Sequence, residues 1–132
     1  MPQQILVNKI QTPDGTILES RHRHDFVSCL DTTTGEWYST DGGLDYIRRS
    51  INSVPAKELD VFVGDQHTKI REEFRWGSYG IDGKGPKVLI PLKDLTNKHI
   101  EAILSTQWQI PGFIRDVFLA EVDFRKGLQH DS

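Results

Sequence analysis

Residues 5–19, ILVNKIQTPDGTILE, place two β-favouring runs on either side of a Pro-Asp-Gly tripeptide at 13–15. Proline presets one backbone dihedral of a tight turn and glycine accepts a positive φ, so this stretch predicts a β-hairpin. A second hairpin is expected from residues 26–30 (FVSCL) and 36–40 (EWYST), which flank a threonine-rich tip. The first third of the chain is therefore predicted to be antiparallel sheet.

A short helix is expected after the second hairpin. Leu44, Ile47 and Ile51 stand at helical spacing, and Asp45 precedes Arg49 by four residues. Both features favour one amphipathic helix over residues 44–51.

The middle of the chain is less regular. Residues 59–63 (LDVFV) predict a strand, whereas residues 67–76 fit both a helical and an alternating pattern and stay undecided. Residues 77–86 contain four glycines and one proline, which predicts a long flexible turn before a strand at 87–91.

Two amphipathic helices are predicted in the last third of the chain. Thr96 is a favourable N-cap, and apolar residues follow it at helical spacing. After a Pro-Gly break at 111–112, a second apolar series begins at Ile114. Glu121, four residues before Arg125, supports that second helix.

Length and pattern together predict an α+β fold. The 132 residues, 15.1 kDa, match a single domain of common size. Within it we expect a sheet-rich part at 1–92, a helical hairpin at 93–126 and a disordered tail at 127–132.

Charge and cysteine content exclude several classes of protein. Sixteen Lys and Arg against nineteen Asp and Glu leave a net charge of −3, which disfavours a general nucleic-acid coat. A single cysteine, Cys29, excludes an internal disulfide and a cysteine-based zinc site. No apolar run is long enough for a membrane span and no signal peptide opens the chain, so a soluble cytosolic protein is expected.

The densest polar cluster is Arg-His-Arg-His-Asp at 21–25. Arginine forks suit phosphate, two histidines at i, i+2 can bind a metal, and a His/Asp pair can do acid–base work. The runner-up function is therefore a metal-dependent phosphodiesterase or nuclease that uses His22, His24 and Asp25. The plain alternative is a solvated or ion-paired surface loop.

A second cluster, DGGLDYIRR, occupies residues 41–49. Two glycines before a helix expose backbone N–H groups that attract anions, and Arg48 and Arg49 add positive charge. Alternatively, the glycines simply permit a tight turn and the arginines stabilise the end of the helix.

The third group lies on the helical hairpin. Asn97 could read a base or ribose edge and Arg115 could fork onto a phosphate. Aromatic side chains are available to stack on a purine. The group comprises Trp76, Thr96, Asn97, Gln107, Trp108, Phe113 and Arg115. A capped helix with a core tryptophan would explain the same residues.

Several strings resemble a family of small phage proteins, the first type of Thoeris anti-defence proteins. They are RHRHDF, DGGLDYIRRS, WGSYGIDGKGP, DLTNKHI and the segment TQWQIP…FIRDVF, and the likeness spans residues 8–125. The resemblance implies a phage sponge, without enzymatic activity or cofactor, that sequesters immune signalling nucleotides in the cytoplasm of the infected bacterium. It implies binding of glycocyclic ADP-ribose isomers and a second site for cyclic trinucleotides of the CBASS type. It also implies a homohexamer built from dimers, with no long nucleic acid and no membrane as partner.

Two sets of ligand-binding residues follow from this resemblance together with the polar clusters. For the cyclic ADP-ribose type, Asn97 and Arg115 match the family's pocket, and Thr96, Gln107 and Trp76 lie beside them in our prediction. For the cyclic trinucleotide type, the expected contacts are Arg21, Arg23, His24, Arg48 and Arg49. No catalytic residue and no metal ligand are expected.

Overall fold

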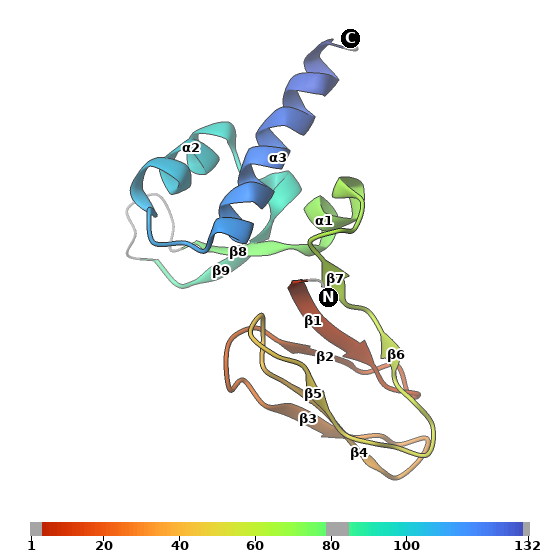
Figure 1. Ribbon diagram of the computed structural model, residues 1–132. Coiled ribbons are helices and arrows are strands. Elements are labelled where there is room, and N and C mark those ends of the chain that lie inside the picture. The colour runs from red at the N-terminus through yellow and green to blue at the C-terminus, as the bar shows by residue number, and fades with distance from the viewer. Residues whose placement is uncertain (1–3, 79–84, 131–132) are drawn as a thin grey trace. The chain divides into compact units, whose positions relative to one another are not determined.

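The protein, seen here as a computed structural model that describes residues 4–78 and 85–130, has the predicted α+β class (Figure 1). It divides into two compact units, Met1–Gly64 and Asp65–Ser132. The described part of the first unit is built of strands. The second combines a two-stranded sheet with helices.

The first hairpin is confirmed as strands β1 (Ile5–Gln11) and β2 (Ile17–Ser20), which pair antiparallel. Gly15 takes a φ of 93° in the turn, a conformation that glycine adopts without steric cost. On its other side β1 pairs with β6 (Lys57–Glu58) and β7 (Val61–Phe62). The sheet therefore has β1 in its interior.

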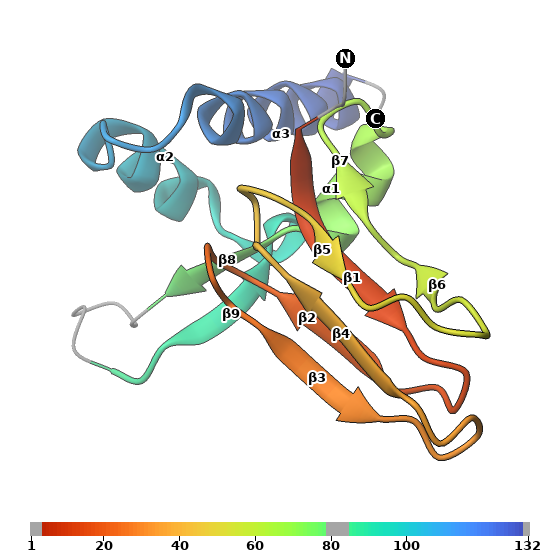
Figure 2. The same cartoon turned by 60° about the horizontal axis from the view of Figure 1, so that its bottom comes forward.

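The second hairpin is also confirmed, as β3 (Val27–Leu30) and β4 (Trp37–Asp41). A two-residue strand, β5 (Arg48–Arg49), extends it to the order β3-β4-β5. Figure 2 shows the two hairpins lying against each other. Their shared core contains Ile10, Leu18 and Tyr38, packed against Val27, Cys29 and Ala56.

The helix predicted over residues 44–51 is wrong. Residues 43–45 form a turn, and the chain then enters β5. Gly42 and Gly43 take φ values of 107° and 53°, outside the helical region. Ile51 is fully exposed and Ile47 is nearly half exposed, so these residues do not form the buried face that an amphipathic helix needs.

The strand predicted at 59–63 is interrupted. β6 ends at Glu58 and β7 begins at Val61, because Asp60 between them turns its carboxylate to the backbone N–H of Lys9 at 2.9 Å. The undecided segment 67–76 contains both patterns in succession. Helix α1 (His67–Glu73) is followed by strand β8 (Arg75–Ser78).

The second unit continues with β9 (Val88–Pro91), which pairs with β8, and a short 3-10 turn η1 (Leu92–Asp94). Most of the turn predicted at 77–86 lies outside the described residues, and residues 77–78 belong to β8. Helices α2 (Asn97–Thr106) and α3 (Gly112–His130) confirm the predicted helical hairpin.

The apolar residues that predicted the two helices form much of the second core. Ile100 and Ile103 of α2 and Val117 and Phe118 of α3 are all buried. Trp76 of β8 packs edge-on against Phe118, with ring centroids 5.1 Å apart.

The chain's last residues differ from the prediction. Residues 127–130, expected to open a disordered tail, belong to α3, which continues because no helix-breaking proline follows Gly112. Residues 131–132 lie outside the described part. None of the described helices is long and apolar enough to cross a membrane.

Candidate functional site

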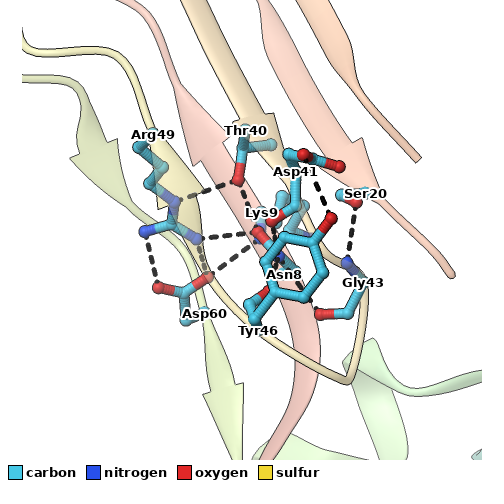
Figure 3. A network of polar contacts seen from close by, with 9 residues as sticks. All are labelled: Asn8, Lys9, Ser20, Thr40, Asp41, Gly43, Tyr46, Arg49 and Asp60. Carbon is cyan, nitrogen blue, oxygen red and sulfur yellow. Dashed lines mark hydrogen bonds and ion pairs between the residues drawn. The ribbon is translucent and has the colours of Figure 1, made fainter. Parts of the chain in front are cut away.

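Two of the polar clusters predicted from the sequence meet in the first unit. The loop at 21–25 is not extended, so the alternating faces expected there do not form. Instead it packs on Gly43, where an added Cβ would stand 2.4 Å from the backbone of His22. The Gly43 N–H donates to the Ser20 hydroxyl at 2.9 Å (Figure 3). Glycine at 43 is thus what lets the two segments approach each other.

His24 and Tyr46 form the contact between these segments. The Nδ1 atom of His24 lies 3.0 Å from the Tyr46 hydroxyl oxygen, and the two ring centroids are 5.9 Å apart. His24 holds a φ of 64°, a left-handed conformation that non-glycine residues rarely adopt. Local backbone bonds support it, since the Phe26 N–H donates to the His24 carbonyl at 3.0 Å.

Tyr46 connects the exposed histidine to a buried acid. Its hydroxyl donates to Oδ2 of Asp41 at 3.3 Å, as Figure 3 shows. Asp41 is 7% exposed, and its Oδ1 atom is buried with no hydrogen-bond partner among the described residues. A buried carboxylate oxygen without a donor is uncommon, and such atoms often mark functional sites.

Positive charge gathers around the same tyrosine. The guanidinium of Arg48 lies 5.5 Å from the centroid of the Tyr46 ring, and Arg48 is exposed. Arg23 is exposed next to His24; its carbonyl oxygen lies 3.2 Å from Nδ1 of His22, and its side chain makes no hydrogen bond or ion pair within the described residues. We call Arg23, His24, Asp41, Tyr46 and Arg48 the His24 cluster.

Two other arginines predicted for this site have different environments. Arg21 is exposed but pairs with Glu19, Nε to Oε2, at 3.3 Å. Arg49 is turned inward, where its guanidinium binds Asp60, Asn8 and Thr40 at 2.5 to 3.0 Å (Figure 3). With its guanidinium committed to these three residues, Arg49 stabilises the interior of the first unit.

The residues of the alternative metal site do not converge. The ring of His22 faces Asp25, Nε2 to Oδ2 at 4.0 Å, while the ring of His24 faces Tyr46. Among the described residues, no group of three or more His, Cys, Asp or Glu side chains could hold a metal ion.

In the second unit, the predicted residues spread along α2 and α3. Thr96 caps α2 by accepting from the His99 N–H at 3.1 Å, and Gln107 is the exposed residue at its other end. Asn97 accepts from Arg125 at 2.7 Å, whereas Arg115 donates to the Leu104 carbonyl at 3.3 Å. Trp76 lies in the edge-to-face contact with Phe118 described above.

A groove of about 340 Å³ runs between these two helices. Its apolar floor contains Ile100, Leu104, Leu119 and Val122, and Asn97, Glu101, Arg125 and Lys126 complete the lining. Arg115 shares the helical face of Leu119 and Val122, one turn earlier, and Lys126 lies one turn later. Arg115, which does not line the groove itself, therefore stands about 16 Å from Lys126 along α3.

The most connected polar group of this unit was not predicted. Glu121 is fully buried and binds His67 at 2.8 Å, Arg71 at 2.9 and 3.0 Å, and Arg125 at 2.6 Å. Burial alone would raise the pKa of Glu121, but hydrogen bonds from Arg71, Arg125 and His67 outweigh it and lower the pKa to about 2. The sequence signal was the Glu121–Arg125 spacing, whereas the partners on α1 are about 50 residues away.

Comparisons with family models, with curated proteins and with solved structures found no match.

Proposed function

We propose that this protein is a phage anti-defence sponge, which binds and sequesters immune signalling cyclic nucleotides without cleaving them. The observation that carries the proposal is the His24 cluster. There Arg48 lies over the Tyr46 ring, His24 contacts the Tyr46 hydroxyl, and Arg23 is exposed next to His24 in the loop. Guanidinium groups form paired hydrogen bonds with phosphate oxygens, so such a cluster favours a phosphorylated ligand.

The ligand is small. A long nucleic acid requires a broad basic surface, and this chain carries a net charge of −3. A compact cyclic phosphate needs only a local group of cations. Phe26, 63% exposed and two residues beyond His24, offers an aromatic face for a base. We assign cyclic trinucleotides of the CBASS type to this cluster.

The groove between α2 and α3 supports a second ligand, the glycocyclic ADP-ribose isomers made in Thoeris immunity. Such a ligand has an anionic pyrophosphate and apolar ring faces. The groove offers an apolar floor and, in its lining, Asn97 and the cations Arg125 and Lys126, while Arg115 lies one turn before Leu119 on α3. The proposed hexamer, built from dimers, would add surfaces from neighbouring copies, and the site of action is the cytoplasm of the infected bacterium.

Sequestration without cleavage requires preorganised donors and no group that activates water. The metal-dependent phosphodiesterase alternative needs His22, His24 and Asp25 around one ion, but only His22 and Asp25 face each other, and the ring of His24 contacts Tyr46. Buried contacts fix the geometry of both proposed sites. Gly43 packs closely against the loop that carries His24, and the buried Glu121 of α3 binds Arg125, which lines the groove.

The deciding experiment measures turnover. The protein is incubated with a cyclic trinucleotide or a cyclic ADP-ribose isomer and denatured by heat, and the released ligand is analysed by mass spectrometry. Intact ligand recovered in stoichiometric amount supports a sponge, whereas linear product formed over many turnovers establishes an enzyme.

A protein that blocks a host enzyme by surface contact alone would show no thermal shift when a nucleotide is added. Ligand at 100 times its dissociation constant stabilises a binder by about 2.7 kcal/mol. Absence of any thermal shift with both nucleotide classes would overturn the sponge proposal.

A further inference from the structure

The His24 cluster contains a chain of polar atoms that leads from the interior to the surface. Oδ2 of Asp41 contacts the Tyr46 hydroxyl at 3.3 Å, and the same hydroxyl oxygen lies 3.0 Å from Nδ1 of His24. Asp41 is buried, while His24 is exposed. The exposed ring is therefore held, through one tyrosine, by a buried acid.

The buried acid sets the direction of the hydrogen bonds. An ionised carboxylate only accepts, and Oδ1 of Asp41 already lacks a donor among the described residues. Leaving Oδ2 without a donor as well would cost the desolvation of a charged group, so the Tyr46 proton is directed to Oδ2. The tyrosine oxygen is then an acceptor toward His24. Nδ1 of His24 must carry a proton, and Nε2 is the atom available for a ligand.

An imidazole held in this way has two states toward a phosphate. When neutral, its Nε2 is an acceptor and offers nothing to a phosphate oxygen; when protonated, Nε2 becomes a charged donor. Charged and titratable neighbours come from both segments that pack here. They are Arg21, His22, Arg23 and Asp25 from the loop, Asp41 at the end of β4, Asp45 and Tyr46 from the connection that follows, and Arg48 of β5.

The backbone supports a functional role for this ring. His24 is the non-glycine residue with positive φ in the described chain, and left-handed non-glycine residues are concentrated at ligand-binding and active sites. The conformation is held by bonds of the loop itself, with Asp25 N–H donating to the His22 carbonyl at 3.0 Å, and by the close approach to Gly43.

We propose that His24, protonated at Nε2, is a phosphodiester-binding donor, and that Tyr46 and Asp41 are positioning residues that present it beside Arg48. The inference rests on the proposed function and deepens it by naming the group that the cluster recognises. Its consequence is selective. Phosphodiester binding at the His24 cluster therefore requires the protonated imidazole, whereas arginine and lysine in the α2–α3 groove donate to an anion without that requirement.

The test uses the full chain labelled with ¹⁵N, and dimethyl phosphate as a probe, because this diester keeps one negative charge throughout the range. Two-bond ¹H–¹⁵N correlation spectra report which ring nitrogen of each histidine carries the proton, and the His24→Gln variant assigns the signal. We expect neutral His24 to be protonated at Nδ1. Dimethyl phosphate should shift its ring signals, with an affinity about tenfold weaker at pH 8.5 than at pH 5.5.

Variants separate positioning from folding. Tyr46→Phe keeps the aromatic ring and its contact with Arg48 but removes the acceptor for Nδ1–H. It should let neutral His24 carry its proton at Nε2, where it can donate to a phosphate oxygen, and so weaken the dependence of the affinity on pH. Asp41→Asn should do the same if it folds. His22 is a neighbouring exposed histidine that does not belong to the hydrogen-bonded series Asp41–Tyr46–His24. His22→Gln should therefore leave the tautomer of His24 and the pH profile of binding unchanged.

The outcomes distinguish this inference from the proposed function. A neutral wild-type His24 that carries its proton at Nε2 instead of Nδ1, or a His24→Gln variant whose pH profile matches that of the wild type, overturns the inference. Cyclic trinucleotide binding that is insensitive to His24→Gln overturns the inference and leaves the sponge standing. If the dimethyl phosphate results hold but no cyclic nucleotide binds, the sponge proposal fails and the phosphodiester site remains.

Discussion

Arg49 binds both carboxylate oxygens of Asp60, Nη1 to Oδ2 at 2.9 Å and Nη2 to Oδ1 at 2.5 Å. The side chain of the adjacent residue, Arg48, is exposed to solvent. Successive residues of a strand point to opposite faces of the sheet. In β5 this places Arg49 against Asn8 and Thr40 in the interior and Arg48 over Tyr46 at the surface. Two adjacent arginines thus have separate tasks.

The first prediction follows from this division. Arg49→Ala leaves Asp60 buried without its main cationic partner, so it should lower the free energy of unfolding by about 3–5 kcal/mol. Arg48→Ala removes an exposed side chain and should change it by no more than about 0.5 kcal/mol. Urea titrations followed by circular dichroism measure both.

Ligand binding should be more sensitive to Arg48→Ala than to Arg49→Ala, which reverses the order expected for stability. Arg48→Ala should abolish the thermal shift produced by a cyclic trinucleotide while the protein stays folded. Equal stability of the two variants would contradict the assignment of Arg49 to the interior.

The second prediction concerns pH. The pKa of Glu121 is lowered to about 2, below the ordinary value for glutamate, so the unfolded chain takes up its proton before the folded protein does. The stability that Glu121 contributes is therefore complete above the unfolded pKa, near 4.3, and is lost as the pH falls toward 2. Thermal unfolding of the wild type should show a decline over this range.

Glu121→Gln is the matching variant. Removing the charge leaves Arg71 and Arg125 close together without the carboxylate, so the variant should be destabilised by about 3–5 kcal/mol at pH 7. Its stability should depend less on pH between 4.3 and 2 than that of the wild type. An unchanged slope over that interval would show that another group is responsible.

The third prediction compares two glycines. At Gly43 an added Cβ would meet the backbone of His22, and φ is 53°, so Gly43→Ala should destabilise the protein by about 2 kcal/mol or more and displace the loop that carries His24. Gly127 in α3 has nothing within 4 Å of an added Cβ. Gly127→Ala should stabilise by about 0.5–1 kcal/mol, since alanine favours a helix. If Gly43→Ala binds a cyclic trinucleotide normally, the close approach does not position the His24 cluster.

The fourth prediction separates the two proposed sites. Arg115→Ala, on the exposed face of α3, should abolish binding of a cyclic ADP-ribose isomer and leave trinucleotide binding largely intact, as measured by isothermal titration calorimetry. The matched variant Arg48→Ala should do the opposite. Loss of both activities in a folded Arg115→Ala protein would contradict separate sites.

Local patterns predicted much of the architecture. Both hairpins formed where a turn with a special backbone conformation interrupts two β-favouring runs, and Thr96 capped α2 as its position before an apolar series indicated. Spacing failed where the apolar residues had nothing to pack against. Leu44, Ile47 and Ile51 have helical spacing. However, the positive φ values of Gly42 and Gly43 favour a turn, and the bond between Arg49 and the buried Asp60 favours a strand.

The candidate sites show the same difference between near and distant partners. The sequence indicated that Arg23, His24 and Arg48 carry suitable charge, and it indicated the Glu121–Arg125 pair by its spacing. The sequence did not predict a functional role for Tyr46 or Asp41, and it did not predict that His67 and Arg71 bind Glu121. Their partners lie far along the chain or depend on a turn that was predicted as a helix.

The sequence by itself determined the α+β class, both hairpins, the helical hairpin and the supply of cations for an anionic ligand, because these depend on neighbouring residues and on composition. Only the tertiary structure decided which cations face outward, since alternation along β5 and the pairing of Arg49 with Asp60 are settled by contacts between distant segments. It likewise decided that His24, Tyr46 and Asp41 form one chain. That arrangement depends on Gly43 letting two loops meet, a relation between segments that no local pattern encodes.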